Sequence, residues 1–458
     1  MGVRQSTQER QRTTLGVRRV SVVGLGKLGF CLAVALADSG FGVIGVDVDR
    51  HKVDAMNSGE SPIYEPGLEK LIALNRGSIS ATSDYGEAVA GTDATFVVVP
   101  TPSETSGGYS LDYVKPAISH LGDAISEKDG YHLVVLTSTV SPGSMDETVL
   151  PLLERKAGKR CGTALGLCYN PEFIALGNVI AGLRIPDVVI IGESDRLAGD
   201  RLSAIHSRLC ADSAPVERMN FLNAELAKIA VNAFVTMKMS FANTLAEICE
   251  RLPGGDVDAI TRAMGRDKRI GARYLKGATG YGGPCFPRDN VAFASFAEGA
   301  GVYADLARAT DRINQRQLER IVAMIERSRP PGSKKIGVLG VTYKPGTNVL
   351  EASQSMMVAE EMSRKGYEVH VYDPAIRPDQ LSASPRLHIE ESAKGCIAAS
   401  DVCVIGTPWE SFAKIPASEF ANKVVVDCWR LLAGTRFGGS TRYLALGRGT
   451  ASRSPSRA

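Results

Sequence analysis

The fold of this chain is decided by one stretch near its start, Arg19-Val20-Ser21-Val22-Val23-Gly24-Leu25-Gly26-Lys27-Leu28-Gly29. Its β-branched first half, up to Gly24, is typical of a buried parallel strand. The pattern Gly-x-Gly-x-x-Gly comes next, and the apolar, alanine-rich segment Phe30–Ser39 predicts a helix that ends at Gly40. A strand, a glycine-rich turn and a helix in this order predict a Rossmann fold that binds a dinucleotide.

The three glycines of this turn allow a tight bend, close approach of a pyrophosphate and close packing of the helix on the strand. Asp47 ends the next predicted strand, about 20 residues on, where an acid binds ribose hydroxyls. Because a carboxylate repels a 2′-phosphate, we expect NAD rather than NADP, with Lys52 either near the adenosine or simply solvated. The residues that this pattern assigns to NAD are Gly24, Leu25, Gly26, Lys27, Leu28, Gly29, Asp47 and Lys52.

Length, charge and cysteine content limit the possible functions. A chain of 458 residues predicts roughly two or three domains. The net charge of +3 gives no argument for a nucleic-acid partner, and no apolar run is long enough to span a membrane. The nine cysteines form no Cys-x-x-Cys pair, which favours reduced thiols in a cytoplasmic protein over a disulfide framework or a metal site.

Strand-like runs and helical patterns alternate along the first half of the chain, which predicts a doubly wound α/β domain. The runs are Thr95–Val99, Leu133–Leu136, Leu165–Tyr169 and Val188–Ile191. Asn223–Glu250 then holds apolar residues at helical spacing without Gly or Pro, which predicts a long connecting helix that also packs on a partner subunit. After the linker Arg329–Ser333, a second α/β domain begins at Lys335 and lacks a complete Gly-x-Gly-x-x-Gly.

A second informative stretch is Gly280-Tyr281-Gly282-Gly283-Pro284-Cys285-Phe286-Pro287-Arg288-Asp289. Cysteines are usually small buried hydrophobic residues, but glycines around Cys285 let another molecule approach it closely. An accessible thiolate is a nucleophile. Beside a nicotinamide cofactor, it predicts oxidation of an aldehyde through a thioester.

Thioester chemistry also needs an oxyanion donor and acid–base groups. Lys228 and Asn232 lie at i and i+4 of the predicted long helix, where a cation and an amide would form an oxyanion hole or a merely solvated face. Glu172, in Asn170-Pro171-Glu172-Phe173, follows a predicted strand. It would lie at the carboxyl edge of the sheet, where ligands bind, unless its role is structural.

Taken together, these motifs resemble the UDP-glucose/GDP-mannose dehydrogenase family over roughly residues 18–430. The resemblance is carried, in order, by Gly24–Gly29 with Val46–Asp49, Ser61–Leu68, Val99–Pro102, Ser138–Gly143, Asn170–Phe173, Glu225–Lys228 with Asn232–Phe234, Arg269–Gly271, the Cys285 loop and Tyr343–Pro345. It implies a four-electron oxidation of the C6 alcohol of a UDP-sugar, UDP-glucose by default, with NAD and one water. The product would serve pathways such as polysaccharide biosynthesis.

The resemblance also implies roles for individual residues. Cys285 would be the nucleophile, and Lys228 and Asn232 would stabilise the oxyanion. Protons and water would be handled by Glu172 and Asp289, with Thr139 placing a water. The resemblance adds Pro100, Thr101 and Thr139 to the NAD site. The residues implied to bind substrate are Glu172, Phe173, Ile174, Lys228, Asn232, Arg269, Tyr274, Lys276, Tyr281, Gly282, Tyr343, Lys344 and Arg430.

The predicted fold class is α/β, with two Rossmann-like doubly wound domains joined by a central helical region. We expect a disordered arm at 1–16 and a flexible tail at 434–458. The predicted domains between them are an NAD-binding domain at 17–215, a helical dimerisation region at 216–328 and a UDP-sugar-binding domain at 334–433. Arg269 resembles an arginine that reaches the sugar of the neighbouring subunit, so we expect a homodimer.

Two departures from the family pattern leave the substrate open. Leu176 stands where the family has a glutamate, and Glu351 stands at an arginine position. This suggests a rearranged contact at the cofactor cleft. A UDP-N-acetylhexosamine 6-dehydrogenase is therefore an alternative. A two-electron β-hydroxyacid dehydrogenase is another, although it would need neither Cys285 nor the segment Lys335–Arg430. A non-catalytic nucleotide-sugar sensor is a third.

Overall fold

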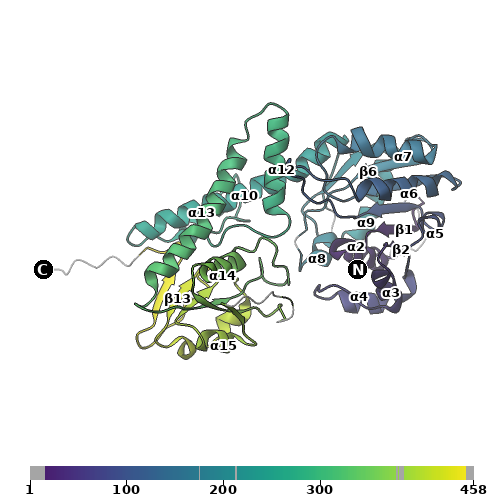
Figure 1. Ribbon diagram of the computed structural model, residues 1–458. Coiled ribbons are helices and arrows are strands. Elements are labelled where there is room, and N and C mark those ends of the chain that lie inside the picture. The colour runs from purple at the N-terminus through teal and green to yellow at the C-terminus, as the bar shows by residue number, and fades with distance from the viewer. Residues whose placement is uncertain (1–15, 175, 212–213, 378–379, 381–385, 450–458) are drawn as a thin grey trace, which may run out of the picture. The chain divides into compact units, whose positions relative to one another are not determined.

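The computed structural model describes residues 16–174, 176–211, 214–377, 380 and 386–449 (Figure 1). The chain divides into two compact units, Met1–Ala230 and Val231–Ala458. The long helix α10 (Phe221–Arg251) contains the boundary, and it matches the long helix expected from the sequence. The predicted arm falls almost entirely on residues 1–15, which lie outside the described residues. The predicted domain boundaries stay predictions.

The first unit is built on an eight-stranded sheet of order β3-β2-β1-β4-β5-β6-β7-β8. Neighbouring strands are parallel except β6 and β7. The strand order reverses at β1, so a topological switch point lies beside it. The strands are β1 (Arg19–Val23), β2 (Gly42–Val46), β3 (Ile79–Thr82), β4 (Ala94–Val97), β5 (His132–Leu136), β6 (Leu165–Tyr169), β7 (Val189–Glu193) and β8 (Val216–Met219).

Helices cover both faces of this sheet (Figure 1). Successive residues of a strand point to opposite faces, so Val22 joins one apolar cluster and Val23 the other. Burial on both faces explains why three of the five residues of β1 are valine. The helices are α2 (Lys27–Asp38), α3 (Arg50–Ser58), α4 (Leu68–Asn75), α5 (Tyr85–Ala90), α6 (Val114–Ser126), η2 (Met145–Val149), α7 (Leu150–Ala157), α8 (Val179–Arg184) and α9 (Arg196–Leu209).

The second unit holds a six-stranded parallel sheet of order β11-β10-β9-β12-β13-β14. Its strands are β9 (Lys335–Leu339), β10 (Glu368–Tyr372), β11 (Leu387–Ile389), β12 (Val402–Ile405), β13 (Val424–Asp427) and β14 (Arg442–Ala445). Its helices, besides the rest of α10, are α11 (Val257–Gly265), α12 (Phe286–Gly299), α13 (Asp305–Ser328), α14 (Gln354–Arg364) and α15 (Ala393–Ala398). The predicted fold class is confirmed.

Strand β14 contradicts the predicted flexible tail at residues 442–445. It pairs with β13, from Val424↔Arg442 to Asp427↔Ala445. Beyond the strand, the N–H of Gly447 donates to Glu250 Oε1 at 2.8 Å, and this bond ties the segment to the end of α10. The polar composition suggested a tail, but pairing with a distant strand decides its structure. The rest of the predicted tail, residues 450–458, lies outside the described residues.

Candidate active site

The glycine turn after β1 has the geometry that a dinucleotide needs. Gly24 has φ +94°, and a side chain there would place its Cβ 2.6 Å from the carbonyl oxygen of Val98. A Cβ on Gly29 would overlap the carbonyl oxygen of Gly24, whereas a Cβ on Gly26 would meet open space. Helix α2 begins directly after the turn, at Lys27. Two glycines therefore hold the turn closed, and Gly26 leaves room for a pyrophosphate at the helix start.

Asp47 follows β2 and is 8% exposed. Its carboxylate accepts hydrogen bonds from the N–H groups of Leu25 and Asp49, at 2.7 and 2.9 Å. Lys52 Nζ lies 3.3 Å from the same carboxylate. A carboxylate has about four acceptor positions, so one remains for a ribose hydroxyl. The residues of this edge thus fit NAD, with Lys52 holding the acid that would bind the ribose.

Further predicted residues follow neighbouring parallel strands. Pro100 and Thr101 come after β4, Thr139 after β5 and Glu172 after β6. Because these strands are parallel, all of these residues lie at the carboxyl edge, together with the glycine turn after β1. The structure therefore brings the predicted NAD residues to one edge with Thr139 and Glu172.

Glu172 and Lys228 meet within the first unit. Lys228 is 5% exposed, and its Nζ donates to the backbone oxygen of Glu172 at 2.7 Å. The same ammonium lies 4.8 Å from the centre of the Phe173 ring. Burial raises the pKa of the Glu172 carboxyl to about 7, against the opposing effect of Lys228. A carboxyl that titrates near neutral pH is suited to move protons.

Within the second unit, Cys285 occupies the N-cap of α12. Cys285 is exposed, and the other cysteines are buried or partly buried. Its backbone oxygen accepts the N–H of Asp289 at 2.8 Å. The buried carboxylate of Asp289 accepts the amide Nδ2–H of Asn232 at 2.6 Å. The structure thus gathers the predicted nucleophile, Asp289 and Asn232 around one turn of helix.

Several predicted substrate residues surround this turn. Tyr274 has φ +58°, is 48% exposed and meets the ring of Phe286 edge-on, with 5.9 Å between ring centres. A Cβ on Gly283 would lie 2.6 Å from the Tyr343 ring, and Lys344 Nζ lies 6.0 Å from the centre of that ring. Gly282 packs closely on the backbone of Ala352. Lys276 Nζ lies 5.9 Å from the centre of the Trp429 ring, a residue to which the sequence assigned no role.

Other predicted substrate residues are engaged differently. Tyr281 is 2% exposed, and its hydroxyl donates to Asp311 at 2.5 Å. Arg430 is buried, ion-paired with Asp258 at 2.7 Å, and donates to the backbone oxygen of Leu446 at 3.0 Å. Both side chains are therefore bonded to residues of their own unit, and contact between them and the substrate stays a prediction.

The remaining predicted residues differ in their exposure and in their contacts. Arg269 is exposed and pairs with Asp267 at 2.6 Å. Ile174 is partly buried near Gly182 of α8, and Leu176 packs on the same apolar cluster. The backbone oxygen of Glu351 accepts the N–H of Gly283 at 3.1 Å. The rearranged contact suggested for Leu176 and Glu351 stays a prediction.

Two carboxylates that support the edge were given no role from the sequence. Glu65 accepts the N–H groups of Gly177 and Val179, at 2.9 and 2.7 Å. Glu225 accepts those of Gly143 and Met145. Both glutamates lie in motifs quoted above, Ser61–Leu68 and Glu225–Lys228, and this was the signal in the sequence that could have pointed to them. The backbone groups that they bind lie far away in the sequence.

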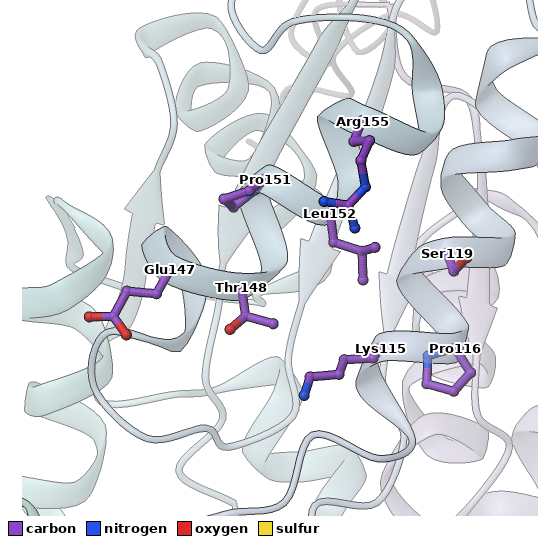
Figure 2. Close-up of a pocket in the computed structure, with 8 residues that line it drawn as sticks. All are labelled: Lys115, Pro116, Ser119, Glu147, Thr148, Pro151, Leu152 and Arg155. Carbon is purple, nitrogen blue, oxygen red and sulfur yellow. The ribbon is translucent and has the colours of Figure 1, made fainter.

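The described residues limit other kinds of site. They contain no group of three or more His, Cys, Asp or Glu side chains able to hold a metal ion, and no helix suited to crossing a membrane. A cavity of about 480 Å³ lies between α6, η2 and α7 (Figure 2). No predicted site residue lines it. Its lining residues are Lys115, Pro116, Ser119, Glu147, Thr148, Pro151, Leu152 and Arg155.

Models of the UDP-glucose/GDP-mannose dehydrogenase family match three consecutive segments: the NAD binding domain at 18–210, the central domain at 222–316 and the UDP binding domain at 337–434. The chain is 34% identical to UDP-glucose 6-dehydrogenase AglM of Haloferax volcanii, over 90% of this chain and 97% of that protein. It is 32% identical to GDP-mannose 6-dehydrogenase of Pseudomonas aeruginosa, over 89% and 96%.

A solved UDP-glucose dehydrogenase from the hyperthermophilic archaeon Pyrobaculum islandicum is similar over 94% of this chain and 98% of that chain, with a TM-score of 0.85 and 33% identity. These findings confirm the resemblance drawn from the motifs. With the three family segments in order, they show that this chain belongs to the UDP-glucose/GDP-mannose dehydrogenase family and is an NAD-dependent oxidoreductase of nucleotide sugars.

Proposed function

We propose that the chain oxidises the C6 hydroxyl of a UDP-sugar to a carboxylate, with UDP-glucose as the first candidate. The observation that carries this proposal is the exposed Cys285 at the start of α12, with Asp289 and Asn232 hydrogen-bonded beside it. Oxidation beyond the aldehyde through a thioester needs such a nucleophile, whereas a two-electron alcohol oxidation does not. Relatives named for UDP-glucose support the sugar, although others are named for GDP-mannose.

The proposed reaction balances in four steps. The alcohol loses a hydride and a proton and becomes an aldehyde. The thiolate of Cys285 then adds to the aldehyde carbon, and the alkoxide takes a proton to give a thiohemiacetal. That carbon loses a second hydride, with the hydroxyl proton, to give a thioester. Water adds to the thioester carbon and breaks the carbon–sulfur bond, which leaves a carboxylate; of its two protons, one goes to the Cys285 sulfur and one is released. When bound, NAD would accept the hydride of each oxidation, so two NADH are expected per sugar.

We assign the protein's contributions to these steps as follows. Lys228 and Asn232 donate to the oxygen that becomes negatively charged, because an ammonium and an amide are the donors that stabilise an oxyanion. Glu172, with its pKa raised to about 7 by burial, moves protons to and from that oxygen and the water. Asp289 orients the Asn232 amide, to which it is bonded, and Thr139 places the water.

We further propose a homodimer in which α10 packs against a second copy. Val231, Phe234, Phe241 and Ile248 are 40%, 59%, 50% and 48% exposed. Their spacing of three and seven residues puts them on one face of the helix. Large apolar side chains gathered on one face are typical of an interface. Arg269 would then reach the sugar in the partner. Phe241→Glu should give monomers in a sizing experiment; an active wild-type monomer would contradict the dimer.

The nine cysteines all lie within the described residues and form no disulfide, which fits a reducing compartment, and we propose a cytoplasmic location on that basis. Expression with a compartment-specific fluorescent tag would check it, and a signal confined to the cell surface would contradict it.

The test of the activity counts NADH per sugar consumed for UDP-glucose, UDP-N-acetylglucosamine, UDP-N-acetylmannosamine, UDP-galactose and GDP-mannose. About two NADH per sugar, with one preferred substrate, supports the four-electron reaction. About one NADH per sugar would mean that oxidation stops at the aldehyde, as in the β-hydroxyacid alternative. Binding without turnover would favour the sensor.

A pair of variants tests the nucleophile. Cys285→Ser should lower carboxylate formation at least about a thousandfold, because serine is not ionised at neutral pH. Cys161→Ser is the matched control, since Cys161 is a partly buried free thiol of the first unit with no part in the proposed chemistry. Equal carboxylate formation by both variants would remove Cys285 from the mechanism.

A further inference from the structure

Glu225 is a buried carboxylate to which the reaction above gives no role. It lies in α10, one turn before Lys228, and is 0% exposed. Its Oε2 accepts the N–H of Gly143 at 2.7 Å, and its Oε1 accepts the N–H of Met145 at 2.8 Å. Both bonded groups belong to backbone far away in the sequence, so this side chain joins α10 to the loop after β5.

The bonded groups form the start of a helix. Met145 is the first residue of η2, which continues directly into α7, and Ser144 at the N-cap makes no side-chain capping bond. The first N–H groups of a helix have no partner within the helix and need an external acceptor. Glu225 supplies that acceptor from another helix, and its negative charge suits the positive end of the dipole. Figure 2 shows Glu147 and Thr148 on the turn that leads from this start into α7.

The capped segment carries Thr139 at its other end. Ser138 Oγ donates to the backbone oxygen of Val99 at 2.7 Å, and Ser141 Oγ accepts the N–H of Tyr109 at 3.2 Å. These two bonds attach the loop to the segment after β4. The Glu225 bonds are different, because they attach the loop to the helix that carries Lys228, whose ammonium holds the Glu172 backbone.

We propose that Glu225 is a positioning residue that fixes the Thr139 loop against Lys228 by capping η2 from α10. This inference rests on the proposed function for its catalytic consequence. Glu225 touches no reacting atom in this scheme. It sets the separation of two elements that do, and small misplacements of reacting groups cost large factors in rate.

Glu225→Gln tests the proposal, because the amide keeps the shape but turns one acceptor into a donor that faces a backbone N–H. Asp93→Asn is the matched control: the Asp93 carboxylate accepts the N–H groups of Arg18 and Arg19, at 2.8 and 3.0 Å, at the amino end of β1. We expect kcat to fall about ten- to a hundredfold in Glu225→Gln, with both KM values within about threefold. Asp93→Asn should lower the melting temperature without changing kcat.

A second measurement does not depend on activity. Amide hydrogen exchange of residues 141–149 should become faster in Glu225→Gln and stay unchanged in Asp93→Asn. If Glu225→Gln fails to fold, Glu225→Asp replaces it, because aspartate keeps the charge but is one methylene too short to make both bonds. Residues 141–149 should then again exchange faster than in the wild type. Unchanged exchange overturns the proposal whatever the activity. If the wild type is active and Glu225→Gln has the same kcat, Glu225 does not influence catalysis. If the wild type itself turns over no nucleotide sugar, the proposed function is refuted instead.

Discussion

The two sheets of this protein begin in the same way and then differ. In each, the first strand ends at a glycine with positive φ, +94° at Gly24 and +85° at Gly340. In each, an aspartate after the second strand accepts the N–H of the residue that follows this glycine: Asp47 from Leu25 and Asp373 from Val341. The helix after the first turn begins at once, whereas α14 begins only at Gln354, beyond the segment 341–353.

This difference shows what a dinucleotide site needs besides a glycine turn. Asp373 also accepts the N–H and hydroxyl of Thr342 and the indole N–H of Trp409. With the N–H groups of Val341 and Ala375, five protein donors reach the Asp373 carboxylate, whereas three reach that of Asp47. A helix start beside the glycines supplies the N–H groups that bind phosphate, and only the first turn has one. The same opening motif is thus followed at once by a helix start that fits a dinucleotide in the first unit, and by the segment 341–353 in the second.

The largest expected effect comes from Gly29→Ala, which changes the helix start beside the glycine turn. The second turn lacks such a helix start. Its Cβ would overlap the backbone oxygen of Gly24, and neither group belongs to a flexible side chain. We expect the free energy of unfolding to fall by about 3 kcal/mol or more. Urea unfolding measures it. Gly26→Ala, whose Cβ meets open space, is the control. Equal stability of the two variants would refute this view of the turn.

Replacing Asp47 and Asp373 by asparagine, one at a time, distinguishes a role in stability from a role in NAD binding. Asp373→Asn should lower the free energy of unfolding by about 1–3 kcal/mol, because an amide nitrogen would face N–H donors in a buried site. NAD binding should not change. Asp47→Asn should instead weaken NAD about tenfold, since the ribose hydroxyl loses a charged acceptor. Calorimetry with NAD and thermal unfolding of both variants check this. A weaker NAD affinity in Asp373→Asn would mean that the second turn also holds the cofactor.

The parts of this comparison that were predictable from the sequence are local. The spacing from Gly24 to Gly29 and the position of Asp47 fix a strand, a turn and a helix within one short segment. The flanking glycines likewise singled out Cys285. Long-range pairing was not predictable: Glu225 reaches Gly143, about 80 residues away, and no local pattern encodes that partner.

The same reason explains the error at the chain's end. A four-residue strand such as β14 carries too little periodicity to be recognised beside Gly and Arg, and only the edge of β13 makes it a strand. The commitment of Arg430 to Asp258 also depends on a contact between segments far apart in the sequence. Local patterns therefore supplied the candidate site residues, whereas the long-range contacts that hold them in place could not be read from such patterns.

Gly26→Ala sharpens the comparison further, with a smaller effect. Because the new methyl group meets only open space, the free energy of unfolding should stay within about 1 kcal/mol of wild type. The same methyl group would occupy the approach of the pyrophosphate, so NAD should bind about tenfold more weakly, equivalent to about 1.4 kcal/mol. Gly340→Ala is strained by its positive φ but should not affect NAD affinity. Unchanged NAD binding in Gly26→Ala would place the cofactor elsewhere.

The smallest expected effect is a pH dependence at the carboxyl edge of the first sheet. Burial raises the pKa of Glu172 to about 7. As a base, Glu172 must be ionised, so kcat should fall about threefold between pH 7.5 and 6.5. Folding favours the protonated carboxyl, so burial lowers the free energy of unfolding as the pH rises from 4.5 through 7.

Variants decide which carboxyl controls that pH dependence, because burial also raises the pKa of Glu225 to about 7, with Asp146 and Glu147 adding to the shift. Glu172→Gln removes the base itself, so its residual rate should lose the decrease at low pH. Glu225→Gln should have a lower kcat but keep that decrease. The reverse pattern would assign the titration to the helix cap: protonation of Glu225 would release an N–H bond and loosen the Thr139 loop. Rate profiles of the two variants from pH 5.5 to 8.5 therefore distinguish a proton-transfer group from a positioning group.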